Sequence, residues 1–231
     1  MNILIPMAGL GTRFLNAGYK NPKPLIKFLN KTMIEHVIDS INIEGKYIFI
    51  VQEEHIKKYQ IDLLLKKIIK DCTVLSINKQ TSGAAETTLF AKKNINNKEQ
   101  LIIANSDQIV KWDSKAFISK LNKGDGCIAV FKDTDPKWSF ADINNDLVIR
   151  VAEKKQISNN ATVGIYGWNF GSDYVKYAEQ MIKKNIRTNN EFYVCPVYNE
   201  AILDGKKIVP FSVEQMYGVG TPEDLERFLN A

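Results

Sequence analysis

The chain has 231 residues, 45% of them hydrophobic and 25% charged, which suits one sizeable core and is short for two full domains. No apolar run reaches the roughly 20 residues of a membrane helix, and no basic segment precedes the first apolar run, so we expect a cytoplasmic protein without anchor or signal peptide. The net charge of +5 suits anionic ligands, but the lysines are scattered, which argues against nucleic acid as a partner.

The cysteines and histidines do not form the pattern of a disulfide framework or a metal site. Cys72, Cys127 and Cys195 are far apart, lie among apolar residues and have no C-x-x-C spacing. His36 and His55 stand on helix-like segments without partner ligands. We therefore expect reduced core thiols and histidines that serve packing or the surface.

The first 25 residues combine a buried strand with a glycine loop. The apolar run at residues 3–5 predicts a parallel strand, and Gly9 and Gly11 follow it closely. Glycines tolerate positive φ and leave the backbone accessible, so successive N–H groups can converge on an anion. Arg13 and Lys23 add an arginine fork and a mobile point charge, and prolines on both sides of Lys23 stiffen its segment. This stretch predicts a phosphate site.

Three other interpretations of this stretch are weaker. A Rossmann dinucleotide motif would need a small residue where Phe14 stands and an acidic residue near Val51 and Gln52. A Walker loop would need Gly-Lys-Ser/Thr, which is absent. A plain glycine turn beside solvated cations would explain G-x-G alone, but not G-x-G-T-R followed by P-K-P-L.

The next segments alternate between helix and strand. Apolar spacing predicts a helix over residues 33–41, capped by Thr32, and another over residues 56–69. Continuous apolar runs predict strands at 47–51 and 73–77. This order predicts right-handed crossovers and a parallel sheet whose ligand crevice lies at the carboxyl ends of its strands.

Two further loops fall at that crevice. In the first, Ser82 and Gly83 precede small Ala84 and open a helix, so a base or ribose could lie against the backbone, although an ordinary glycine-started helix would look the same. In the second, a buried strand at 101–104 ends in N-S-D-Q. Asp107 is well placed there to hold Mg²⁺ against phosphate oxygens; alternatively it caps the helix from Ser114 or closes the turn.

The second half of the chain contains shorter strands. Runs at 127–131, 140–143, 148–152 and 163–168 predict antiparallel strands that form one wall of a pocket. Beyond them we expect a helix over 174–186, a loop leading into a helix within 191–203 with Tyr193 in the core, a strand region at 208–213 and a helix that starts at Thr221.

The motifs resemble those of the nucleotidylyltransferases that make nucleotide-activated sugars and alditols, whose hallmarks are G-x-G-T-R and a later P-K-P. The resemblance implies transfer of a nucleotidyl group from an NTP to a phosphorylated acceptor, with release of pyrophosphate. It implies catalytic roles for Arg13 and Lys23 and Mg²⁺ binding at Asp107. It implies nucleotide contacts at Ala8, Gly9, Gly11, Thr12, Gln80, Ser82, Gly83, Ala84, Asn105 and Ser106.

The acceptor side resembles the same family. Residues 151–164 are similar to its E-K-P segment followed by S-N-x-A-x-x-G, which implies acceptor contacts by Glu153, Lys154, Gly164 and, further on, Glu191. The chain departs from the family at Pro6-Met7, in the short spacing from Gln80 to Gly83, at Lys155 in place of proline, and at Gly218, where a second metal aspartate is expected. Phosphates and water, or another carboxylate, would have to complete the metal coordination.

Together these features predict a single Rossmann-like α/β domain over residues 1–231, with three α/β/α layers and a mixed, mainly parallel sheet. The resemblance favours CTP, because the chain lacks the appended segments of longer family members, and it favours a small sugar, alditol or similar phosphate, for a surface polysaccharide. A homodimer is compatible with the sequence. The alternatives are a glycosyltransferase that uses an NDP-sugar, although N-S-D-Q is not its D-x-D motif, and a nucleotide-binding regulator without turnover.

Overall fold

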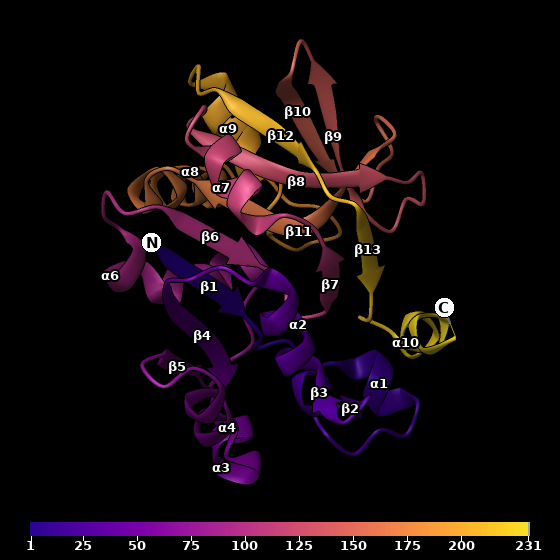
Figure 1. The fold of residues 1–231 in the computed structure, drawn as a ribbon. Coiled ribbons are helices and arrows are strands. Elements are labelled where there is room, and N and C mark those ends of the chain that lie inside the picture. The colour runs from indigo at the N-terminus through magenta and orange to yellow at the C-terminus, as the bar shows by residue number, and fades with distance from the viewer. Residues whose placement is uncertain (231) are drawn as a thin grey trace.

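The computed structural model describes residues 1–230, in which one sheet of nine strands forms the centre of the fold (Figure 1). Its first half is parallel, in the order β6-β1-β4-β5. These strands are β1 (Asn2–Pro6), β4 (Lys46–Gln52), β5 (Thr73–Ile77) and β6 (Leu101–Ala104). The apolar runs of the sequence therefore predicted each strand of this half, and their parallel pairing is confirmed.

The second half of the sheet is largely antiparallel, as expected. Strand β11 (Asn160–Trp168) runs antiparallel to β6, to β8 (Gly126–Lys132) and to β9 (Ser139–Asn144). Strand β9 continues into β10 (Leu147–Glu153) through a two-residue turn, and β12 (Ile208–Ser212) adds a parallel edge to β8. The mixed sheet of the predicted fold class is confirmed.

Helices cover both faces of this sheet because successive strand residues point to opposite sides. Ile3 and Ile5 face α2 (Met33–Ile41), α4 (Ile61–Ile68) and α7 (Ser114–Leu121). Leu4 faces the opposite core. That core contains α5 (Ala84–Thr88), the 3₁₀ turn Leu89–Ala91, α6 (Lys92–Ile95), α8 (Gly171–Lys183) and α9 (Val197–Leu203). The result is the three-layer arrangement that the sequence predicts.

Helix α2 begins where the sequence places its cap. The Thr32 hydroxyl accepts a hydrogen bond from the Glu35 backbone N–H, and the Glu35 carboxylate accepts one from the Thr32 N–H at 2.7 Å. This reciprocal capping box satisfies two donors that a helix start otherwise leaves unpaired. The following helical segment differs from the prediction. It starts earlier, as α3 (Glu53–Tyr59), and Gln60 at φ 50° separates it from α4.

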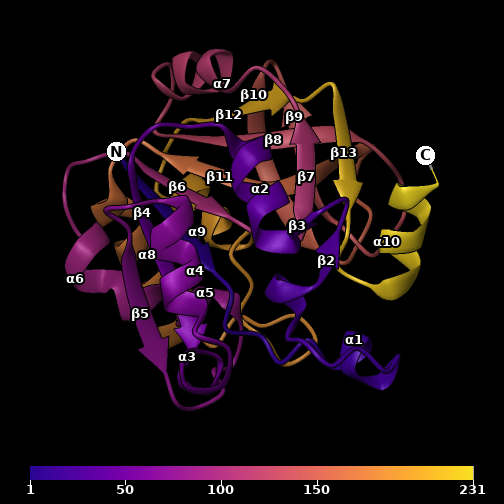
Figure 2. The same ribbon diagram turned by 60° about the horizontal axis from the view of Figure 1, so that its bottom comes forward.

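A small third core joins segments from the two ends of the sequence. Helix α1 (Thr12–Asn16) and helix α10 (Pro222–Leu229) lie near each other in both ribbon views (Figures 1 and 2). The short strands β2 (Lys27–Phe28) and β3 (Lys31–Thr32) complete this region. The buried residues of this third core are Phe14, Ile26, Phe28, Met33, Val219 and Leu225.

One ribbon beside this core was not predicted from the sequence. Strand β7 (Gln108–Lys111) pairs antiparallel with β13 (Gln215–Gly218). The ribbon places Gly218 opposite Gln108, so the residues just after β13 lie next to Asp107. None of the helices within residues 1–230 is both long and apolar enough to cross a lipid bilayer.

Candidate active site

The glycine loop after β1 packs directly against the P-K-P segment. Gly11 has φ 63°, in the left-handed region, and a Cβ at this position would lie 3.1 Å from the Lys23 Cβ. Lys23 begins a 3₁₀ turn, Lys23–Leu25, and the Gln52 side chain donates a hydrogen bond to the Ala8 carbonyl at 2.6 Å. Gly11 thus supplies both the conformation and the space that bring the loop and Lys23 together.

This loop forms one wall of a cavity of about 320 Å³, which we call the loop cavity. The opposite wall comes from the segment before α5 and from the end of β6. Predicted site residues that line it are Ala8, Gly9, Gly11, Thr12, Lys23, Gln80, Gly83, Ala84, Ser106 and Glu191. Polar backbone, five glycine or alanine residues and one lysine make this cavity suitable for an anionic ligand with a flat organic part.

Two predicted nucleotide contacts lie elsewhere. Ser82 is not part of the loop-cavity lining; its N–H donates to the Glu86 carboxylate at 2.5 Å, and its carbonyl accepts from the Phe192 N–H at 2.7 Å. Asn105 lines the neighbouring cavity instead. Asn105 and Ser106 follow β6 in succession, but Asn105 lines that neighbouring cavity and Ser106 the loop cavity.

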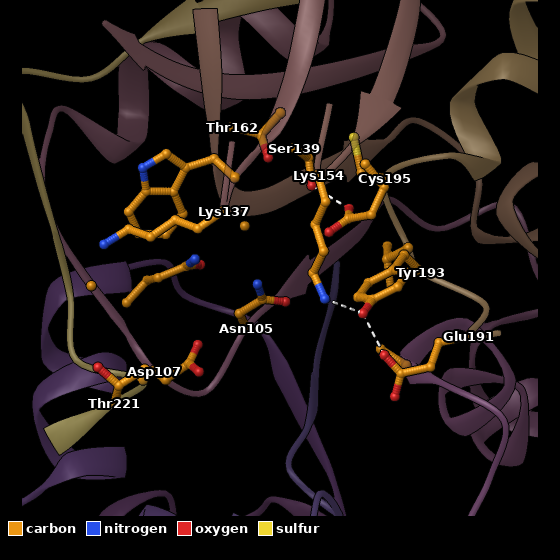
Figure 3. A pocket seen from close by; sticks show the side chains of 18 of the residues that line it. Asn105, Asp107, Lys137, Ser139, Lys154, Thr162, Glu191, Tyr193, Cys195 and Thr221 are labelled. Carbon is orange, nitrogen blue, oxygen red and sulfur yellow. Dashed lines mark hydrogen bonds between the residues drawn. The ribbon is translucent and has the colours of Figure 1, made fainter. Parts of the chain in front are cut away.

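The neighbouring cavity, of about 570 Å³, lies against the antiparallel strands, and we call it the sheet cavity (Figure 3). Its lining brings together predicted residues from most of the chain, namely Arg13, Ala84, Asn105, Asp107, Glu153, Lys154, Gly164 and Glu191. Ala84 and Glu191 line both cavities. Two ligands bound in the two cavities would therefore share a wall.

An ion pair stands where the cavities adjoin. The Lys23 Nζ lies 2.7 Å from the Asp107 Oδ2, and about four-fifths of each side chain is shielded from solvent. Lys23 lines the loop cavity and Asp107 the sheet cavity. The pair places a cation and an anion side by side at this boundary, so both can contact a ligand group that extends from one cavity into the other.

The surroundings of Asp107 fit a magnesium ion held by a single protein carboxylate. A Cβ on Gly220 would come within 2.6 Å of the Asp107 Oδ2, so the glycine leaves space beside this oxygen, which also accepts a hydrogen bond from the Lys23 ammonium. A Cβ on Gly218 would lie 2.8 Å from a ring carbon of Trp138, so the indole leaves no room for an aspartate there. Residues 1–230 contain no cluster of three or more His, Cys, Asp or Glu suited to a metal. Mg²⁺ accepts one or two carboxylates together with substrate phosphates and water.

One end of the sheet cavity holds a half-buried carboxyl group. Glu153 accepts a hydrogen bond from the Ser139 hydroxyl, and Thr162 and Tyr166 line the same end. Burial raises the pKa of the Glu153 carboxyl above its ordinary value, although the Ser139 hydrogen bond and the Lys154 charge act in the opposite direction. Uncharged hydrogen-bonding groups beside a carboxyl group suit a ligand rich in hydroxyls.

A pH-dependent change in stability follows from Glu153. Because the pKa is raised on folding, the stabilising contribution of the protonated group is present below about pH 4.5, the unfolded value, and is lost as pH rises through the folded pKa. Glu153→Gln should therefore be more stable than the wild type at pH 8, with a smaller difference at pH 4.5. Urea unfolding of both proteins at the two pH values measures this; a difference independent of pH would contradict it.

Gly164 must be small for a steric reason. Its φ is 71°, and a Cβ would lie 1.9 Å from the Gln108 Oε1 and 2.4 Å from the Asn105 Nδ2. We expect Gly164→Ala to lower the free energy of unfolding by roughly 2–4 kcal/mol, the sum of left-handed strain and overpacking. Gly205→Ala is the matched control, because Gly205 has φ 78° but open space at its Cβ, and should lose only roughly 1–2 kcal/mol. Urea unfolding of both variants measures the difference. Equal losses of unfolding free energy in the two variants would contradict the claim that a Cβ at position 164 is overpacked.

The sequence did not reveal several residues of this cavity. Trp138 and Lys137 come from the loop before β9, and Asp224 comes from α10, where it pairs with Lys137 at 2.9 Å. Tyr193 was predicted to lie in the core, but it is half-buried and lines the cavity, whereas Phe192 is buried as expected. Tyr193 lies two residues after Glu191 in a non-helical segment, and this spacing could have indicated that both side chains face the same cavity.

Two of the three thiols lie in the core, as the sequence predicts. Cys127 and Cys195 are buried, Cys72 is half-buried, and all three are free. Cys195 lines the sheet cavity, but burial raises the pKa of its thiol well above the ordinary value, so it is a poor nucleophile near neutral pH.

Curated proteins of similar sequence are nucleotidylyltransferases. The mannose-1-phosphate guanylyltransferase catalytic subunit beta of Dictyostelium discoideum is 28% identical over 185 residues, which cover 73% of this chain and 50% of that protein. The UTP–glucose-1-phosphate uridylyltransferase 1 of Staphylococcus saprophyticus is 25% identical over 203 residues, covering 71% of this chain and 70% of that protein. The chain spans about half the length of the guanylyltransferases that it matches.

Solved structures extend the similarity to nearly the whole chain. A nucleoside-diphosphate-sugar pyrophosphorylase from Vibrio cholerae RC9 matches with a TM-score of 0.87 and 26% identity, covering 99% of this chain and 100% of that one. The inositol-1-phosphate CTP transferase from T. maritima shares the fold, with a TM-score of 0.78 at 15% identity over 99% of this chain and 92% of that one. The family described as nucleotidyl transferase matches residues 3–230. With its glycine loop, its paired cavities and this match over nearly its full length, the chain belongs to the nucleotidyl transferase family.

Proposed function

We propose that this protein transfers a nucleotidyl group from a nucleoside triphosphate to a small phosphorylated acceptor and releases pyrophosphate. The observation that carries the proposal is the Lys23–Asp107 pair at the boundary of two cavities, one lined by the glycine loop and the other by Lys154 and Glu153. The triphosphate occupies the loop cavity, and the acceptor occupies the sheet cavity.

In the proposed reaction an acceptor phosphate oxygen attacks the α-phosphorus, and the bond from that phosphorus to the bridging oxygen of the β-phosphate breaks. The attacking oxygen is already ionised near neutral pH, so the protein need not remove a proton. Alignment and neutralisation of charge supply the catalysis. Lys23 acts beside the α-phosphate, and Lys154 holds the acceptor phosphate. The family resemblance assigns Arg13 to the leaving pyrophosphate, although Arg13 lines the sheet cavity and not the loop cavity. Asp107 would hold Mg²⁺, which neutralises phosphate charge when bound.

We propose CTP as the nucleotide and a sugar phosphate, alditol phosphate or similar metabolite as the acceptor, in the synthesis of a surface polysaccharide. The resemblance to CTP-using family members supports the base, whereas the names of the curated relatives give GTP and UTP. The hydroxyl-rich end of the sheet cavity, at Ser139, Thr162 and Tyr166, supports a polyhydroxylated acceptor.

The test is pyrophosphate release from CTP, UTP, dTTP, GTP and ATP, each assayed with a panel of sugar, alditol and other small metabolite phosphates. Release that requires both substrates supports the proposal, and the fastest pair identifies the base and the acceptor. Tight NTP binding without release across the whole panel would instead indicate a nucleotide-binding regulator. Turnover of an NDP-sugar, with transfer of the sugar, would indicate a glycosyltransferase.

A further inference from the structure

Tyr193 connects two charged residues of the sheet cavity (Figure 3). Its hydroxyl accepts a hydrogen bond from the Lys154 Nζ at 2.5 Å and donates one to the Glu191 carboxylate. The same ammonium lies 4.7 Å from the centroid of the Tyr193 ring. One side chain therefore contacts Lys154 both through its hydroxyl and through its ring.

The direction of these hydrogen bonds is fixed. A carboxylate can only accept, so the Tyr193 proton is directed to Glu191, and the lone pairs of the phenolic oxygen remain for the Lys154 ammonium. Burial and the Glu191 charge raise the pKa of the Tyr193 hydroxyl well above its ordinary value, so it keeps this proton throughout the physiological range. The chain of three groups thus has a single orientation.

Lys154 differs from the other cavity lysines in what it contacts. Lys23 and Lys137 form ion pairs with Asp107 and Asp224, but no ion pair to Lys154 occurs within residues 1–230. A carboxylate partner would neutralise the ammonium, whereas a neutral phenol holds it in place and leaves its charge available for an anion.

The backbone also fixes Lys154. Its φ is 52°, a left-handed conformation that side chains other than glycine adopt at a cost, and its N–H donates to the Trp138 carbonyl at 3.0 Å. A free lysine side chain loses rotamer entropy when it is immobilised. Because Tyr193 already restricts it, less of this loss remains to be met when a ligand binds.

We propose that Tyr193 is a positioning residue, which holds the Lys154 ammonium toward the acceptor phosphate while Glu191 orients the Tyr193 hydroxyl. The proposal rests on the proposed function, since it assigns the sheet cavity to a phosphorylated acceptor. Glu191 also lines the loop cavity, so the chain of contacts reaches from one ligand cavity to the other.

The test compares Tyr193→Phe with the wild type. Phenylalanine keeps the ring beside the ammonium and removes only the hydroxyl, so we expect the acceptor KM to rise about tenfold, the size of one hydrogen bond to a charged group. The NTP KM should stay within about twofold, because Tyr193 is not part of the loop-cavity lining. An unchanged acceptor KM would overturn the proposal.

A double-variant cycle separates positioning from a general structural effect. If Tyr193 acts through Lys154, adding Tyr193→Phe to Lys154→Ala should change the acceptor KM by less than about twofold. If the acceptor KM of the double variant instead rose by the product of the two single-variant increases, the proposal would be overturned.

Tyr177→Phe is the matched control. On α8, Tyr177 also lies beside a lysine, Lys176 at 4.7 Å from its ring, and donates to a carboxylate, Asp204, at 2.8 Å. There the lysine pairs with the carboxylate itself at 2.6 Å, so we expect an unchanged KM.

A second readout does not depend on turnover. Calorimetric titration with inorganic phosphate should show a binding event that Lys154→Ala weakens and that Tyr193→Phe weakens several-fold, while Tyr177→Phe leaves it unchanged. The proposal would be overturned if Tyr193→Phe bound phosphate as tightly as the wild type does. It would also be overturned if Lys154→Ala left the phosphate affinity unchanged. A wild type that releases no pyrophosphate with any acceptor would refute the proposed function, and this titration would still decide whether Tyr193 positions Lys154.

Discussion

Lys23→Ala is expected to lower kcat by on the order of 10²-fold with every acceptor, because it removes a cation that neutralises charge as the pyrophosphate leaves. Arg13→Ala should behave in the same way. Steady-state kinetics with saturating acceptor measures both. The side chain of Lys23 packs at the boundary of the two cavities, so its loss affects chemistry more than it affects the hydrophobic cores.

Lys31→Ala is the control for this prediction. Lys31 also pairs with an aspartate, Asp39, at 2.6 Å, but both side chains are about half exposed. Such exposed pairs contribute little, so the control should retain its activity and the wild-type stability. If Lys23→Ala and Arg13→Ala were as active as the Lys31→Ala control, Arg13 and Lys23 would be solvated surface cations, and the proposed site would be wrong.

Asp107→Asn is expected to keep the fold and to lose turnover by about 10²-fold or more at limiting Mg²⁺, because a neutral amide is a poor ligand for a hard cation. Rates measured over a series of Mg²⁺ concentrations test this, and thermal melts check the fold. Mn²⁺ binding, followed by electron paramagnetic resonance in the presence of NTP, gives a readout independent of turnover.

Asp39→Asn is the matched control for Asp107, since it removes an aspartate from a lysine pair on the exposed surface. It should leave both the Mg²⁺ dependence and Mn²⁺ binding unchanged. Wild-type activity of Asp107→Asn at limiting Mg²⁺ would show that this carboxylate is not the metal ligand.

The sequence predicted those parts of the fold that depend on local pattern. The buried runs of β1, β4 and β6 are continuous because both faces of a central parallel strand are covered, and Thr32 is followed by Glu35 at capping-box spacing. The break at Gln60 was missed because a polar residue in the left-handed region looks like any surface position of a helix. Strands β7 and β13 were missed because each has only four residues and because they pair with each other across a long separation in the sequence.

The site was predictable where a motif fixes the backbone, and less so where side chains meet across the sheet. Gly11 and Lys23 follow β1 closely, and the structure brings them into contact. Tyr193 was missed because an aromatic residue within an apolar run usually belongs to the core. Trp138, which occupies the space beside Gly218, comes from a segment 80 positions earlier in the sequence, and nothing local to either residue indicates that they meet.

The third core has a consequence for how the protein is made. Phe14, Phe28 and Met33, which support the glycine loop and the P-K-P segment, pack against Val219 and Leu225. During vectorial synthesis the parallel strands can assemble early, but a nascent chain lacks these last packing partners until it has been translated beyond residue 225. The glycine loop is translated well before Val219 and Leu225, so its hydrophobic support is completed long after the loop itself.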